Sequence, residues 1–116
     1  MKRREFLAGS AGAAVLGATG LRPALAAAEP TMTTVAKIVG VPYFSLLEQG
    51  LVSAGKQMDI ASTMVGPAHV DPAQQVRLVE DTIAKKVDVL GLIPLDTKVL
   101  APVVQRARDA GIVVIT

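Results

Sequence analysis

The sequence predicts an α/β fold, a doubly wound parallel sheet in which four strands alternate with three helices. Short apolar runs rich in β-branched residues recur along the chain, and segments with helical periodicity separate them. The run 87–93 is almost continuously apolar, as expected for a parallel strand that is covered on both faces. Each intervening segment is long enough for a right-handed crossover. Four strands amount to a partial sheet of this class.

The first 28 residues predict an export signal, and residues 29–116 predict the folded domain. A basic cluster opens the chain, an uncharged span rich in Ala and Gly follows, and small residues then stand at the spacing that a signal peptidase accepts. The uncharged span 6–21 contains several glycines and is shorter than the roughly 20 residues of a membrane-spanning helix. We therefore expect a cleaved leader, a periplasmic mature chain and no stable membrane insertion.

A pair of arginines near the start of the leader indicates which class of export signal it belongs to. The leader resembles twin-arginine signals at Arg3, Arg4, Phe6 and Leu7. Its mild apolar span, rich in Gly and Ala, is typical of that class. These four residues are thus the expected recognition part of the leader.

The charge balance of the predicted domain argues against nucleic acid as a partner. The whole chain has 12 Lys and Arg, 10 Asp and Glu and a formal net charge of +2. Four of the basic residues and one of the acidic residues lie in the first 28 positions, which leaves 8 basic against 9 acidic residues in the domain, a net charge of −1. The domain therefore lacks the basic surface that binds phosphate backbones.

The stretch 33–44 is the first apolar run after the leader, and it holds two adjacent aromatic rings. Its β-branched residues predict a buried strand. Because Pro42 cannot donate to a sheet, the strand should give way to a loop by about Gly40. The residues that this strand is expected to deliver to one end of the sheet are Lys37, Tyr43 and Phe44.

The remaining elements follow from periodicity and from end signals. Helices are expected at 45–58, 72–86 and 97–110, and strands at 60–65, 87–93 and 112–116. Asp71 before Pro72 is a strong helix start, because the carboxylate caps free N–H groups and proline fits the first helical position. Asp96 or Thr97 can cap the last helix, and Gly111 ends it.

Each helix also carries a predicted buried stripe. The expected stripe residues are Leu47, Leu51, Ala54 and Met58 in the first helix, Val76, Val79 and Ile83 in the second, and Leu100, Val103 and Ala107 in the third. Gly55 lies inside the first helix, where glycine is less favourable than alanine. We expect this small residue to allow close approach of the helix to the sheet.

With the segments placed in this order, the mature chain resembles the amino-terminal lobe of periplasmic sugar-binding proteins of the ribose-binding type, the soluble receptors of ABC importers. Residues 37–44, Lys-Ile-Val-Gly-Val-Pro-Tyr-Phe, are similar to the first ligand loop of autoinducer-2 and rhamnose receptors. The other matching segments are 65–67, 75–88, 93–96 and 110–116.

The resemblance implies a noncatalytic protein that binds a sugar or an autoinducer-2-like ligand and presents it to an ABC permease in the inner membrane. Tyr43 and Phe44 match the aromatic pair that stacks on the sugar ring. Lys37 matches a basic pocket residue, and Asp96 matches an acid at the cleft rim. Because these receptors are much longer and close two lobes around the ligand, the resemblance also implies a truncated form.

Structural roles for the same residues stay open. Tyr43 and Phe44 can be core residues at a helix start, although adjacent residues face different directions and at least one ring should leave the core. Lys37 can extend its ammonium group to water from the end of the sheet. Asp96 can serve only as a helix cap.

Other classes of protein are the alternatives. One is an exported flavodoxin-like or receiver-like enzyme, but a receiver needs acidic residues for Mg²⁺ after its first strand, where this chain has Lys37. A regulatory domain would need a DNA-reading helix-turn-helix and conflicts with the leader. The last alternative is a non-functional fragment that aggregates through the exposed sheet edge at residues 112–116. With no cysteine and His69 as the only histidine, neither a metal nor another cofactor is expected.

Overall fold

The computed structural model describes residues 28–116, which form a four-stranded parallel sheet and three helices. In chain order the elements are β1 (Thr31–Val35), α2 (Pro42–Gln57), β2 (Ala61–Val65), α3 (Pro72–Ala84), β3 (Val89–Leu92), α4 (Thr97–Asp109) and β4 (Val113–Ile115). The order across the sheet is β2-β1-β3-β4, and every neighbouring pair is parallel. The predicted doubly wound α/β class is confirmed.

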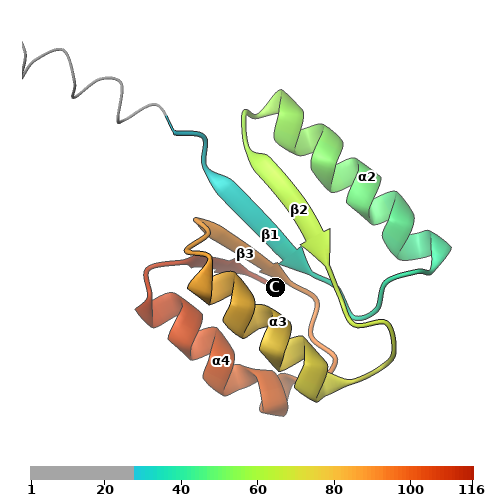
Figure 1. The fold of residues 1–116 in the computed structure, drawn as a ribbon, viewed down its shortest axis with the longest axis vertical. Helices are drawn as coiled ribbons and strands as arrows, with labels where there is room; N and C mark the ends of the chain where they lie inside the picture. The colour runs from blue at the N-terminus through green and yellow to red at the C-terminus, as the bar shows by residue number, and fades with distance from the viewer. Residues whose placement is uncertain (1–27) are drawn as a thin grey trace, which may run out of the picture.

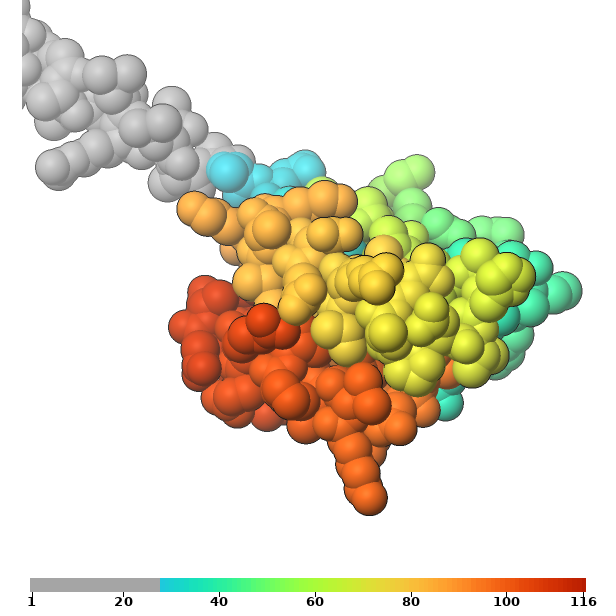
Figure 2. Space-filling view, turned by 60° about the horizontal axis from the view of Figure 1, so that its bottom comes forward, coloured from blue at the N-terminus to red at the C-terminus, as the bar shows by residue number. Residues whose placement is uncertain are grey.

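Helices cover both faces of the sheet (Figure 1). α2 packs along β2 on one face, whereas α3 and α4 lie side by side on the other. Figure 2 shows the α3 and α4 segments, yellow and orange to red, in direct contact over much of the visible surface. The main core lies between this helix pair and the sheet, and its buried members are Val35, Val79, Val87, Leu90, Leu92, Leu100, Val103, Ala107 and Ile112.

α2 approaches the sheet through a glycine. Gly55 is buried, and a Cβ atom at this position would lie 2.7 Å from the Ile60 carbonyl oxygen and 2.8 Å from the Cβ of Ser62. The predicted close approach is therefore confirmed. Because Gly55 faces the sheet, Ala54 and Met58 turn outward and are exposed, so this part of the predicted buried stripe is wrong.

The other two helices follow their end signals closely. Asp71 and Asp96 cap α3 and α4, and Gly111, with φ +83°, ends the turn after α4, as predicted. The predicted stripe of α4 is fully buried. In α3 the buried residues are Gln75, Val79 and Thr82, and the other two residues of the predicted stripe lie only partly buried at its margin.

β1 ends earlier than the sequence predicts. It pairs with β2 along its whole length, and the last bond of this ladder runs from the Ala36 N–H to the Val65 carbonyl at 2.8 Å. Threonines fill much of the strand, because their branched Cβ suits the pleat as well as valine does. The apolar Ile38 and Val39, expected within the strand, are instead partly buried in the following loop.

α2 begins at Pro42, three residues earlier than the sequence predicts. Pro42 occupies its first turn, where the missing N–H costs nothing, so this proline starts the helix as well as ending the loop. Tyr43 and Phe44 therefore lie in the first turn of α2 and not ahead of the helix.

The predicted export signal, with Arg3, Arg4, Phe6 and Leu7, lies outside the described residues apart from its last position. Within 28–116, no helix combines the length and the apolar character that crossing a bilayer requires. The leader and its cleavage stay predictions.

Candidate functional site

The carboxyl ends of the parallel strands meet at one edge of the sheet, which we call the carboxyl rim (residues 36–41, 66–71 and 93–96). The strand order reverses between β1 and β3, since the chain moves outward from β1 to β2 and then returns to the other side of β1. Ligands of open α/β sheets bind at such a switch point. The loop after β1 leads to α2 on one face, and the loop after β3 leads to α4 on the other (Figure 1).

Backbone hydrogen bonds tie the loops of the carboxyl rim together. The Val39 N–H donates to the Pro67 carbonyl at 3.0 Å, and the Ile93 N–H donates to the Val35 carbonyl at 3.0 Å. Gly66 allows the first of these contacts, because a Cβ there would lie 2.9 Å from Cγ1 of Val39. The loop after β1 is thus fixed to the loop after β2, and the loop after β3 is fixed to the end of β1.

Two aromatic rings stand at the start of α2. Tyr43 is 72% exposed and Phe44 is half-buried. Their ring centroids lie 5.1 Å apart with an interplanar angle of 88°, an edge-to-face arrangement that stabilises an aromatic pair. Neither ring is sealed in the core, and one ring holds the other in a defined orientation.

The two charged candidates lie on neighbouring loops. Lys37 is exposed in the loop after β1, two residues beyond the end of that strand. Asp96 is exposed, and its Oδ1 accepts from the N–H groups of Lys98 at 2.9 Å and Val99 at 3.1 Å. The structural role of Asp96 as a cap is real. Its Oδ2 has no hydrogen-bond partner within residues 28–116, which leaves one oxygen for a ligand.

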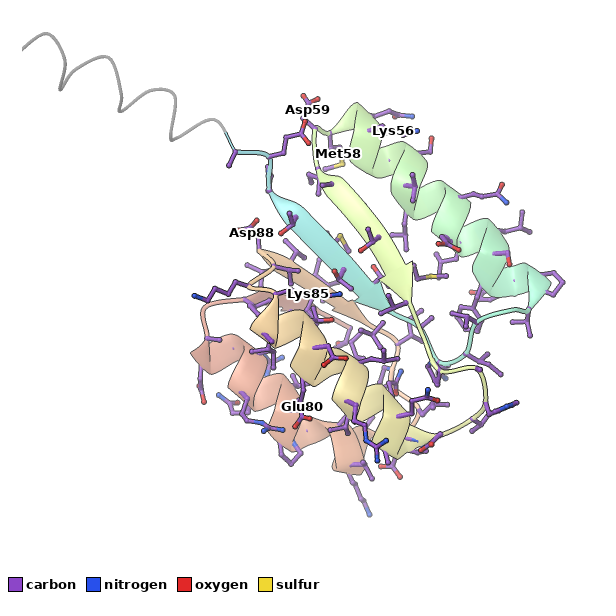
Figure 3. All side chains as sticks on the ribbon, in the orientation of Figure 1. Lys56, Met58, Asp59, Glu80, Lys85 and Asp88 are labelled. Atoms are coloured by element: carbon purple, nitrogen blue, oxygen red, sulfur yellow. The ribbon has the colours of Figure 1, made fainter. Side chains whose placement is uncertain are left out.

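The structure brings all four sequence-predicted residues to the carboxyl rim or to the helix turn that leaves it. Figure 3 labels Asp59 and Asp88, which lie at the opposite edge, where β1 begins. A hollow of about 320 Å³ lies beside Asp96 between α4 and the sheet, lined in part by Pro94 and Thr97, and includes neither aromatic ring. The four residues lie on two loops and a helix turn at this end of the sheet, and none of them lines this hollow.

Sequence reasoning missed Gln75, a residue of α3 whose side chain reaches the carboxyl rim. It lies on α3 with 0% of its surface exposed, and its side-chain amide bonds to backbone groups of both central loops. Its position four residues before Val79, on the buried face of an amphipathic helix, is the signal that would have found it.

The chemistry of the carboxyl rim suits binding. Aromatic faces pack on the C–H face of a ring, whereas an ammonium group donates and a carboxylate oxygen accepts hydrogen bonds. Residues 28–116 hold no group of three His, Asp or Glu side chains that would serve as a metal site. The residue that follows Ala36 is a lysine, where a receiver-like enzyme would need an acid.

A doubly wound α/β sheet with charged residues on the loops beside its switch point has the arrangement at which proteins of this fold class bind ligands. Residues 32–116 match the model of the periplasmic binding protein domain. The chain belongs to the periplasmic binding protein domain family, a family of binding proteins of transport systems.

Relatives of known name and structure agree. The chain is 34% identical over 90 residues to a D-ribose/D-allose-binding protein of Pseudomonas aeruginosa, an alignment that covers 75% of this chain and 28% of that protein. It is 33% identical to an ABC transporter solute-binding protein of Actinobacillus succinogenes solved with D-allose, with a TM-score of 0.70 over 74% of this chain and 30% of that one. A solute-binding protein of Burkholderia multivorans, solved with an unknown ligand that was interpreted as α-D-erythrofuranose, is 36% identical, with a TM-score of 0.71 over 76% of this chain and 32% of that one.

The autoinducer-2 resemblance is weaker than the sugar resemblance. LsrB of Clostridium saccharobutylicum, solved with autoinducer-2, has a TM-score of 0.70 over 72% of this chain and 26% of that one, but only 23% identity, so it shares the fold alone. The chain spans between 28% and 32% of the lengths of the sugar-binding relatives above.

Proposed function

We propose that this chain is one lobe of a sugar receptor, which binds a pentose or hexose at the carboxyl rim and passes it to an ABC permease. The proposal is supported by the positions of Lys37 and Asp96 on the loops after β1 and β3, on either side of the switch point, and of Phe44 in the first turn of the helix that the β1 loop enters, in a chain of this family. A rim of this kind contacts one side of a ligand.

A sugar ring presents an apolar C–H face and polar hydroxyl groups, and the proposed site has residues for both. The half-buried Phe44 ring packs on the C–H face, and Tyr43 supports that ring edge to face. Lys37 donates to ring hydroxyls, and the free Oδ2 of Asp96 accepts from one. The apolar contact orients the sugar and the polar contacts select among hydroxyl patterns.

The relatives favour a sugar over autoinducer-2 as the ligand. The relative that shares 33% identity was solved with D-allose, and the curated relative that shares 34% identity is a D-ribose/D-allose-binding protein, whereas the autoinducer-2 receptor shares 23%. Autoinducer-2 therefore enters the test as a competing ligand.

Tyrosine fluorescence supplies a direct test, because Tyr43 is the only tyrosine and the chain has no tryptophan. The purified chain is titrated with D-ribose, D-allose, L-rhamnose and autoinducer-2, with the linear polyol sorbitol as a control that lacks a ring face. We expect saturable changes with at least one cyclic sugar at a Kd of about 1 mM, near −4 kcal/mol, since one lobe makes only part of the contacts. Neither emission change nor heat with any sugar would contradict the proposal.

Export and transport belong to the same proposal. The basic, glycine-rich leader with Arg3 and Arg4 supports delivery to the periplasm, and the family supports a permease in the inner membrane as the partner. The export signal at 1–28 and the lobe at 29–116 are the two parts of this organisation.

A further inference from the structure

Gln75 is a polar side chain buried completely within the domain. It lies on α3, one turn before the core residue Val79, and 0% of its surface is exposed. A primary amide has two N–H donors and one carbonyl acceptor, and burial without partners destabilises the folded state. The partners of this amide therefore show why it is tolerated in the core.

The Gln75 amide connects two loops of the carboxyl rim. Nε2 donates to the carbonyl oxygens of Ala36 at 3.0 Å and Ile93 at 2.8 Å. Oε1 accepts from the Leu95 N–H at 2.8 Å. These partners fix the orientation of the amide, because carbonyls can only accept and a backbone N–H can only donate. Both donors of the side chain are thus in use.

These bonds continue the link between β1 and β3 beyond the sheet. The last backbone bond from β3 to β1 runs from the Ile93 N–H to the Val35 carbonyl at 3.0 Å. After this point the two loops turn to opposite faces, and the Gln75 side chain joins Ala36 to Leu95. Each of these residues directly precedes a predicted ligand contact, Lys37 in one loop and Asp96 in the other.

We propose that Gln75 is a positioning residue that fixes the loop carrying Lys37 relative to the loop carrying Asp96 and thereby sets the affinity for the sugar. The effect on affinity rests on the proposed function. The link between the two loops is a property of the domain and is measured without a ligand.

A matched pair of variants separates positioning from core stability. Gln75→Met keeps the length of the side chain and removes all three hydrogen bonds. Val79→Ala removes buried carbon from the same face of the same helix, at another residue with 0% exposure, and leaves the hydrogen bonds in place. Gln75→Asn is a second variant that stays polar and uncharged but shortens the side chain by one methylene, which draws the amide away from the two loops.

Amide hydrogen exchange of the full chain, followed by NMR, reads out the link. In the wild type the Leu95 amide should be protected although it lies outside the β3 ladder. In Gln75→Met it should exchange about tenfold faster relative to Ile93, the change produced by losing a hydrogen bond of ordinary strength. Val79→Ala should raise both rates in proportion.

The same variants are titrated with D-allose. We expect Gln75→Met to weaken binding by about tenfold or more and Val79→Ala to leave it unchanged within the folded population. Equal affinity of the two variants would overturn the positioning role.

Two other outcomes are a Gln75→Met variant that does not fold and a wild-type chain that binds no sugar. If Gln75→Met does not fold, Gln75→Asn and the wild-type exchange rates decide, and a Leu95 amide that exchanges as fast as that of the exposed Ala68 overturns the link. If the wild type binds no sugar, the proposed function fails, while selective loss of Leu95 protection would still support the link between the loops.

Discussion

Asp71 and Asp96 cap successive helices with the same geometry. Oδ1 of Asp71 accepts from the N–H groups two and three residues ahead at 3.0 and 3.1 Å, and Oδ1 of Asp96 does so at 2.9 and 3.1 Å. Both side chains are exposed, and each is the last residue of a loop of the carboxyl rim. The pair therefore offers two aspartates with one structural role, of which only Asp96 stands beside the switch point.

The first prediction uses this pair. Asp71→Ala and Asp96→Ala should each lower the free energy of unfolding by about 1 kcal/mol, the usual cost of losing a cap. Only Asp96→Ala should also weaken sugar binding, because it removes the free Oδ2. Thermal unfolding and sugar titration of both variants check this, and equal affinities would assign Asp96 to capping alone.

Two glycines of α2 give opposite predictions. Gly55→Ala should destabilise the domain by about 2 kcal/mol, because its Cβ would meet a backbone carbonyl oxygen at 2.7 Å. Gly50→Ala should stabilise it by about 0.5–1 kcal/mol, since nothing lies within 4 Å and alanine favours the helix. Urea unfolding measures both, and a stabilising Gly55→Ala would disprove the close packing of α2 on β2.

The exposed side of β4 predicts self-association. Val113 and Ile115 alternate onto one face, with 59% and 53% of their surface exposed, and β4 is an edge of the described sheet. Apolar edge strands pair with other chains. Ile115→Lys should therefore lower the sedimentation coefficient at high concentration, whereas Val70→Lys, at a loop residue that is 72% exposed, should not. A chain that is monomeric before mutation would refute this.

The leader makes a separate prediction about export. Replacing Arg3 and Arg4 together by lysine keeps the charge and removes the guanidinium groups that define the twin-arginine class. The chain should then remain in the cytoplasm of a bacterium with an active twin-arginine pathway, while Arg22→Lys should be exported normally. Cell fractionation gives the answer, and periplasmic recovery of the double variant would assign the leader to another route.

The topology was predictable because it depends on local signals. Asp71 with Pro72 marks a helix start, Gly111 marks a helix end, and both signals depend only on neighbouring residues. The candidate residues on the carboxyl rim could be named because the carboxyl ends of parallel strands share one edge.

The errors arose where tertiary contacts decide. Pro42 is compatible both with a loop and with the first turn of a helix. The pairing of β1 with β2 ends at Ala36, and Pro42 lies in the first turn of α2. Gln75 was missed because its burial depends on how α3 is rotated against the sheet. Periodicity defines such a rotation only to within about one residue.

The central claim is that the carboxyl rim binds a sugar, and an amide chemical-shift map of the full chain with D-allose tests it most directly. We predict saturable shifts at Lys37, Phe44 and Asp96 and none at Asp59 and Asp88 on the opposite edge. Shifts confined to the opposite edge, or no saturable shifts with any of the cyclic sugars, would contradict the account.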